Sequence, residues 1–166
     1  MEMTGLDDVT DRILEVAVII TDLDFNPLDE LHRIVHQPLS VLENMNDWCK
    51  KTHGASGLTE ECVKSKFSLD TVEQDVVDLI DKHYGKDDRV VLCGNSIEND
   101  RRFVDRHMPK FAHRLHYRMV NVSSFKEVYR DKYGLKFEKG DAHRAVDDIR
   151  ESIKELQYYL SFVKTN

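Results

Sequence analysis

The sequence contains no long apolar run and no leader-like start. No segment of its 166 residues approaches the roughly 18 consecutive apolar residues that a membrane-spanning helix requires. The start is acidic, with Glu2, Asp7 and Asp8, whereas a secretory signal is basic and then apolar. We therefore expect a soluble protein that does not associate with membranes, located in the cytoplasm or, in a eukaryote, in mitochondria.

The sequence is also poor in cysteine and in clustered basic residues. Cys49, Cys62 and Cys93 are odd in number and widely spaced, which favours neither a disulfide framework nor a Cys-x-x-Cys metal site, so we expect buried thiols. The formal net charge is −7, and there is no basic stripe of the kind with which proteins track long nucleic acids. A nucleic-acid ligand would therefore be short.

No internal repeat, low-complexity tract or linker divides the chain. Its length and its 40% hydrophobic content suit one globular core, so we expect a single domain spanning residues 1–166. Residues 12–22 are almost continuously apolar and β-branched, which predicts a buried strand, and Asn26 and Pro27 mark a turn before a second strand at residues 31–35. This start predicts a hairpin.

After the hairpin, strands and helices are expected to alternate. Helices are predicted in residues 40–52, from about residue 59, from residue 68, from about residue 96, from about residue 123 and over residues 141–162, with strands at residues 89–93 and 119–122. This order predicts an α/β fold, with a mixed sheet and helices on its faces.

Asp100 is the acidic residue that the periodicity singles out. In its predicted helix it lies three residues after Ile97 and four before Val104, hence on their apolar face. A carboxylate on that face needs a cation, hydrogen-bond donors or a metal, because an unpaired buried charge is strongly unfavourable. An ion pair with Arg101 or Arg102 is the structural alternative.

A second acidic cluster begins the long final helix. Asp148 lies beside Ala145 and Ile149 at the edge of the buried stripe, whereas Asp147 projects toward solvent, so Asp148 is the better candidate for a metal ligand. His143 precedes it. The alternative is structural, because acidic residues favour the first turns of helices through the helix dipole.

Long sequence blocks resemble one family. The blocks are EMTGLD at residues 2–7, DWCKKTHGASGL at 47–58, GNSIENDRRF at 94–103, HYR at 116–118 and HRAVDDIRESIKEL at 143–156. Together they resemble the oligoribonucleases, small 3′-to-5′ exoribonucleases of the DEDD superfamily that use a catalytic His. The resemblance covers essentially the whole chain.

The resemblance implies a ribonuclease H-like fold and a two-metal active site. Glu2, Asp100 and Asp148 match metal ligands for two Mg²⁺ or Mn²⁺ ions, and His143 matches the general base. Carboxylate oxygens suit such hard cations, and a neutral imidazole can take a proton from an attacking water near neutral pH. Hydrolysis of short RNA, from dinucleotides upward, to nucleoside 5′-monophosphates is the implied reaction.

The resemblance also assigns the substrate-binding positions, which are Leu6, Trp48, His53, Ser96, Tyr117 and Arg118. The first two match a hydrophobic wedge and a ring on which a base stacks, worth about 1 to 3 kcal/mol. Three polar side chains, at positions 53, 96 and 118, match a cap on the substrate's 5′ phosphate, and Tyr117 matches a residue contributed across a homodimer interface. Trp48 could instead belong to the core, and Arg118 could be a solvated charge.

One acidic position of the family pattern is not in the sequence. The Asp of the family's Asp-x-Glu would immediately precede Met1, so we expect the first central strand to be largely missing and the activity to be impaired. Either the start of the protein is misassigned and an upstream strand ends in this Asp, or the sequence begins at Met1 and the enzyme is impaired. A form extended to include that Asp is expected to hydrolyse dinucleotides orders of magnitude faster.

The sequence is also compatible with two other functions. One is a DNA-directed exonuclease of the same superfamily, against which the HYR block and the Trp48 segment argue. The other is a catalytically dead dimeric module that binds oligonucleotides or a protein partner. A comparison of short RNA with short DNA tests the first alternative, and tight binding without metal-dependent turnover would support the second.

Overall fold

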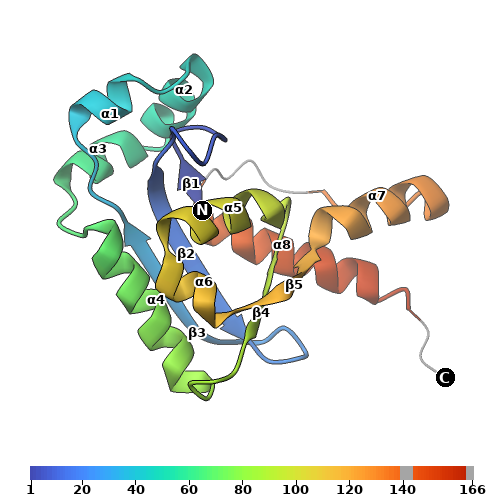
Figure 1. Cartoon of the computed structure of the whole chain (residues 1–166). Coiled ribbons are helices and arrows are strands. Elements are labelled where there is room, and N and C mark those ends of the chain that lie inside the picture. Colours follow the sequence, from blue (N-terminus) through green and yellow to red (C-terminus); the bar gives the residue numbers. More distant parts are fainter. Residues whose placement is uncertain (139–143, 164–166) are drawn as a thin grey trace.

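The β2–β3 hairpin is the longest strand pair of the fold. The computed structural model describes residues 1–138 and 144–163 (Figure 1). Strand β2 (Ile13–Thr21) pairs antiparallel with β3 (Pro27–Ile34), and on its other side with the short β1 (Glu2–Met3). The predicted hairpin is confirmed, with a second strand that begins earlier than expected.

A parallel pair of strands forms a second sheet. Strands β4 (Val90–Gly94) and β5 (Leu115–Asn121) are connected through helices α5 (Ile97–His107) and α6 (Pro109–Arg114). The α/β class with antiparallel and parallel pairing is confirmed. In the described part of the chain the strands form two sheets, one in the order β1–β2–β3 and the other of β4 and β5.

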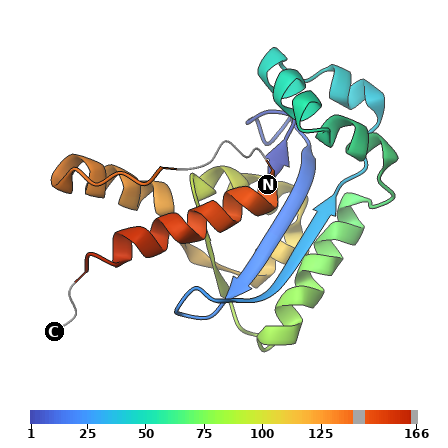
Figure 2. The same ribbon diagram turned by 180° about the vertical axis from the view of Figure 1, so that it is seen from behind.

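Helices cover both sheets. Helix α4 (Leu69–His83) begins at the predicted Ser68, whose side chain accepts a hydrogen bond from the Thr71 main-chain nitrogen, and it packs along β2 and β3 (Figure 2). Its Val72, Val76 and Ile80 share one core with residues of β2, α5 and α6. Helix α8 (Ala145–Leu160) packs against β2 and β4.

Helices α1 to α3 pack at one end of the hairpin. The helix predicted over residues 40–52 is divided into α1 (Leu39–Glu43) and α2 (Asp47–Ala55), followed by α3 (Leu58–Lys64). The division lies at Asn46, whose side chain accepts a hydrogen bond from the Cys49 main-chain nitrogen and so caps α2. These helices enclose a separate small core around Leu14 and Leu42.

The last two helices lie against each other. Helix α7 (Val122–Tyr133) ends at Gly134, which adopts a left-handed conformation with φ of 68° that glycine accommodates without strain. Its Tyr129 ring packs 5.1 Å from the buried Tyr159 ring of α8. The predicted start of α8 at residue 141 lies outside the described residues.

The cysteines differ in their surroundings. Cys49 and Cys62 are buried free thiols as expected, and burial raises the pKa of Cys62 to about 12. The expectation was wrong for Cys93, which is exposed because β4 alternates between exposed and half-buried positions instead of being buried on both faces.

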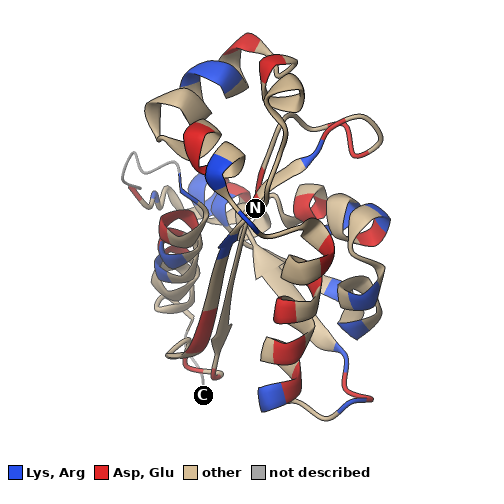
Figure 3. Cartoon of the chain, turned by 90° about the vertical axis from the view of Figure 1, so that its left-hand side faces the viewer, with Lys and Arg blue, Asp and Glu red and all other residues tan. Residues whose placement is uncertain are grey.

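Charged residues of both signs lie on the helices. Figure 3 shows acidic and basic positions on the helices of one side, and the sequence, with a net charge of −7, has no basic stripe. Among the described residues, no helix is both long enough and apolar enough to cross a membrane.

Candidate active site

Glu2 lies where β1 meets β2. The strand register places it directly opposite Glu15 of β2, and its side chain is 20% exposed. Burial raises the pKa of Glu2 to about 7, the Met1 ammonium partly opposes the rise, and the negative charges of Asp148, Glu15 and Asp100 add to it. Carboxylates from β1, α5 and α8 therefore share one neighbourhood.

Asp100 lies in the first turn of α5 and faces the start of the chain. Its Oδ1 atom accepts a hydrogen bond from the Met1 amino group, 2.8 Å away, and its side chain is 19% exposed. The alternative of an ion pair with a neighbouring arginine is wrong, because Arg101 pairs with Asp105 and Arg102 donates to Asn99.

Asp148 lies in the first turn of α8. Its main-chain nitrogen donates to the main-chain oxygen of Arg144, which is the first hydrogen bond of the helix. Its charge contributes to the raised pKa of Glu2, although the residue itself is exposed. The predicted general base, His143, lies outside the described residues.

The three predicted metal ligands supply suitable donor atoms. Their carboxylate oxygens are the hard ligands that Mg²⁺ and Mn²⁺ take. Within residues 1–138 and 144–163, however, no three His, Cys, Asp or Glu side chains lie close enough together to hold a metal ion. The ligand roles of Glu2, Asp100 and Asp148 therefore stay predictions that the donor chemistry fits.

Leu6 and Trp48 present apolar side chains to solvent. Leu6 is 63% exposed and Trp48 is 64% exposed, so Trp48 is not a core residue. The loop that carries Leu6 is held to α5 by an ion pair of 2.6 Å between Asp8 and Arg106. A Cβ atom at Gly5 would lie 2.3 Å from the Asp11 carboxylate, so any larger residue there would have to displace this side chain.

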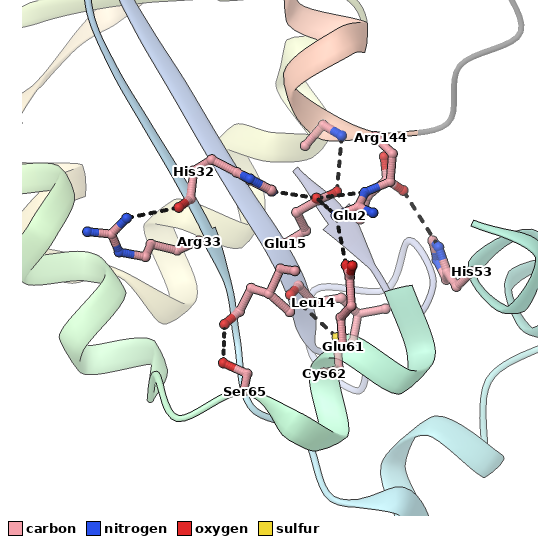
Figure 4. A network of polar contacts seen from close by, with 12 residues as sticks. Glu2, Leu14, Glu15, His32, Arg33, His53, Glu61, Cys62, Ser65 and Arg144 are labelled. Atoms are coloured by element: carbon pink, nitrogen blue, oxygen red, sulfur yellow. Dashed lines mark hydrogen bonds and ion pairs between the residues drawn. The ribbon is translucent and has the colours of Figure 1, made fainter. Parts of the chain in front are cut away.

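His53 is buried beside Glu2 and Trp48. Its Nε2 atom lies 3.0 Å from the Met3 main-chain oxygen, and its Nδ1 atom lies 4.0 Å from Glu2 Oε2 (Figure 4). Its ring meets the Trp48 ring edge-on, with the ring centres 6.5 Å apart. Burial lowers the pKa of His53 and so favours the neutral ring. The structure thus brings His53 to the acidic neighbourhood.

Ser96 has a partner that the sequence analysis missed. Ser96 adopts a left-handed conformation with φ of 46°, and its main-chain nitrogen donates to the Ser123 hydroxyl, 3.0 Å away. The two residues follow the carboxyl ends of the parallel strands β4 and β5, which meet at one sheet edge. A serine after each predicted strand was the sequence signal that could have identified Ser123.

Tyr117 and Arg118 are exposed on β5. Tyr117 is 72% exposed, its ring stacks 4.5 Å from that of His116, and the Arg118 guanidinium lies 5.1 Å from its centre. An exposed aromatic ring backed by a cation could take part in either substrate binding or subunit contact. The proposed role of Tyr117 across a dimer interface stays a prediction.

Comparisons with known proteins agree on one family. The exonuclease family RNase_T matches residues 1–156. The chain is 44% identical over 164 residues to "Oligoribonuclease, mitochondrial" of Mus musculus, covering 96% of this chain and 69% of that protein. It is 45% identical over 163 residues to "Oligoribonuclease" of Francisella tularensis subsp. tularensis, covering 96% of this chain and 90% of that protein. It is also 44% identical over 162 residues to "Probable oligoribonuclease" of Dictyostelium discoideum, covering 96% of this chain and 85% of that protein.

Proposed function

We propose that this chain removes nucleotides from the 3′ end of short RNA and releases nucleoside 5′-monophosphates. The proposal starts from its family, because the chain belongs to the oligoribonucleases of the RNase_T exonuclease family. The observation that carries the proposal is the acidic neighbourhood of Glu2. Asp100 and Asp148 come from segments far apart in the sequence, yet their charges act together on the Glu2 carboxyl group. The amino group of Met1, the neighbour of Glu2, also donates to the Asp100 carboxylate at 2.8 Å, and carboxylates brought near one another from distant segments are common at cation sites.

We propose that Glu2, Asp100 and Asp148 hold two divalent cations, Mg²⁺ or Mn²⁺. When bound, such cations stabilise the negative charge that develops on the attacking and leaving oxygens of a phosphodiester. His143 would accept the proton of the attacking water, because a neutral imidazole is an effective base near neutral pH. In this proposal Glu2, Asp100 and Asp148 are cation ligands and His143 is the base.

Substrate binding is proposed to use apolar and polar groups around this neighbourhood. Trp48 offers an exposed ring on which a base can stack without being identified, and the exposed Leu6 is proposed as a hydrophobic wedge. Ser96, His53 and Arg118 are proposed to contact the 5′ phosphate, which would limit the enzyme to short RNA. The net charge of −7 and the absence of a basic stripe from the sequence support this limit, because a long polyanion would gain little from counterion release.

We further propose a homodimer in which Tyr117 acts across the interface, since its ring is 72% exposed on β5. A cytoplasmic location is proposed, or a mitochondrial one in a eukaryote, because the names of the mouse and human relatives include "mitochondrial".

Hydrolysis of an RNA dinucleotide tests the proposed function. With Mn²⁺ or Mg²⁺ present, we expect nucleoside 5′-monophosphate as product, loss of turnover on addition of a chelator, and a much slower reaction with the matching DNA dinucleotide. Asp100→Asn should lower turnover by at least about 100-fold if a metal ligand is lost. Tight RNA binding without metal-dependent turnover would instead favour a binding module, and equal rates on DNA would favour a DNA-directed exonuclease.

A further inference from the structure

Glu15 is a buried carboxylate within an otherwise apolar part of β2. It is 0% exposed, and so are its neighbours Leu14 and Val16. A carboxylate in such a place is strongly unfavourable unless several donors surround it. The residues that donate hydrogen bonds to Glu15 therefore show which segments its carboxylate connects.

Donors on two other segments point at the Glu15 carboxylate (Figure 4). The Ala145 main-chain nitrogen donates to Oε2 at 3.0 Å, and Arg144 donates to Oε1 from Nε at 3.0 Å. His32 of β3 places its Nε2 atom 2.6 Å from Oε1. Two of these three donor residues belong to the start of α8.

The same contacts lead directly to a predicted metal ligand. Ala145 is the first residue of α8, and Arg144, which precedes it, accepts the main-chain N–H of Asp148 on its own carbonyl oxygen at 3.0 Å. Arg144 is also paired with Glu61 of α3 at 2.8 Å. The segment that donates to Glu15 is thus connected to the backbone of Asp148 by a single hydrogen bond.

Glu15 is also a neighbour of the other predicted ligand segment. In the β1–β2 register Glu15 is the direct cross-strand partner of Glu2. Residues directly opposite in an antiparallel pair carry their side chains on the same face of the sheet, with Cβ atoms about 5 Å apart. Glu15 therefore lies between the segment of Glu2 and the first turn that carries Asp148.

We propose that Glu15 is a positioning residue that fixes Glu2 and Asp148 relative to each other, by binding the start of α8 to β2. The proposal rests on the proposed function, because it needs these two carboxylates to be metal ligands. In this proposal Glu15 is not itself a ligand, and its oxygens accept hydrogen bonds from Ala145, Arg144 and His32 instead. Its effect on metal binding is exerted through the backbone.

Glu73 provides a matched control elsewhere in the fold. It is also a buried carboxylate, 3% exposed, and it accepts hydrogen bonds from the main-chain nitrogens of Lys110 at 2.6 Å and Phe111 at 3.2 Å. It thereby holds the start of α6 to α4, in the same way that Glu15 holds the start of α8. A purely structural role would make the two carboxylates equivalent.

The test compares Glu15→Gln with Glu73→Gln in the full chain. We expect both variants to be less stable in urea, but only Glu15→Gln to raise the Kd for Mn²⁺, measured by calorimetry, by about tenfold. Amide hydrogen exchange at Asp148 should accelerate in Glu15→Gln and stay unchanged in Glu73→Gln. With an RNA dinucleotide, kcat should fall in Glu15→Gln while KM changes little.

Arg144→Lys is the second variant, used if Glu15→Gln does not fold. Its side chain is 27% exposed, and lysine keeps the charge but cannot contact Glu15 and Glu61 through one planar fork. Unchanged Mn²⁺ affinity and unchanged exchange at Asp148 in the folded variant would overturn the proposal. If the original chain binds no Mn²⁺, the proposed metal site fails, whereas the exchange comparison still decides whether Glu15 holds α8.

Discussion

His53 donates a hydrogen bond from Nε2 to the main-chain oxygen of Met3, 3.0 Å away. A carbonyl oxygen can only accept, so Nε2 carries the proton and, in the neutral ring, Nδ1 carries a lone pair. Within the described residues Nδ1 has no hydrogen-bond partner, and it lies 4.0 Å from Glu2. The neutral His53 ring thus holds β1 in place at Met3, next to the candidate metal ligand Glu2.

Replacement of His53 by Phe should destabilise the protein. Phe keeps a buried ring but leaves the Met3 oxygen without its donor, which costs about 1–3 kcal/mol for a buried acceptor. The free energy of unfolding in urea measures the loss. His53→Gln, which retains an N–H donor, should recover part of it, and a His53→Phe protein as stable as the original would contradict this role.

The stability contribution of Glu15 should depend on pH. Burial by itself raises the pKa of Glu15, but hydrogen bonds from Ala145, His32 and Arg144 outweigh burial and hold the pKa below its usual 4.5. The folded protein therefore binds this proton less readily than the unfolded chain does. The contribution is fully present above the unfolded pKa and is lost as the pH falls through the lower, folded pKa.

Urea unfolding of the original chain and Glu15→Gln between about pH 7 and about pH 3 measures this dependence. The difference in unfolding free energy should be largest near neutral pH and should shrink as the pH falls below the usual carboxyl range. If the difference in unfolding free energy instead grows in acid, the pKa of Glu15 is raised rather than lowered in the folded protein, and Glu15 is not held in its charged form.

Trp48→Ala should weaken binding of short RNA with little loss of stability. The ring is 64% exposed, so its removal uncovers little core. Loss of one stacked base should weaken dinucleotide binding by about 10- to 100-fold, which corresponds to about 1–3 kcal/mol. Equilibrium binding and urea unfolding check the two parts. Trp48→Phe should restore much of the affinity, and Leu23→Ala, at a 98% exposed position on the β2–β3 turn, should change neither quantity.

Ser123→Ala should reduce discrimination for a 5′ phosphate. The Ser123 hydroxyl donates to Asn95 at 3.1 Å and accepts from the Ser96 main-chain nitrogen, so it holds Ser96 in its left-handed conformation. We expect the preference for a 5′-phosphorylated over an unphosphorylated dinucleotide to fall about fivefold, as for one hydrogen bond of about 1 kcal/mol.

Ser152→Ala is the control for this prediction. Its hydroxyl accepts a hydrogen bond from the Asn95 side chain at 2.7 Å and donates to the main-chain oxygen of Asp148 at 2.7 Å rather than to Ser96. That variant should keep the original preference, and an equal loss in both variants would assign the effect to Asn95 rather than to Ser96.

Features set by neighbouring residues were predictable from the sequence. The position of Asp100 on the inner face of α5 follows from its spacing to Ile97 and Val104, and the start of α4 follows from the capping serine at position 68. The division between α1 and α2 was also signalled locally, by Asn46 before Asp47, but the apolar spacing across the gap concealed it.

Features set by distant residues were not predictable. Glu15 looks like an interruption of an apolar strand until its donors, 129 and 130 residues away, are seen. Whether Trp48 was core or surface depended on which helices would pack against α2, and spacing within one helix does not contain that information. The separation of β1 and β2 from β4 and β5 likewise depends on long-range pairing.

Cys93 differs from the other two cysteines in exposure, which allows a thiol-reactive label to be attached at this one position. Cys49 and Cys62 are enclosed, and burial raises the pKa of each, so neither offers a reactive thiolate at neutral pH. Cys93 is exposed at the end of β4, two residues before Asn95, although burial of its sulfur raises its pKa as well. A maleimide fluorophore should therefore attach slowly and selectively there, giving an optical reporter close to the sheet edge that holds Ser96.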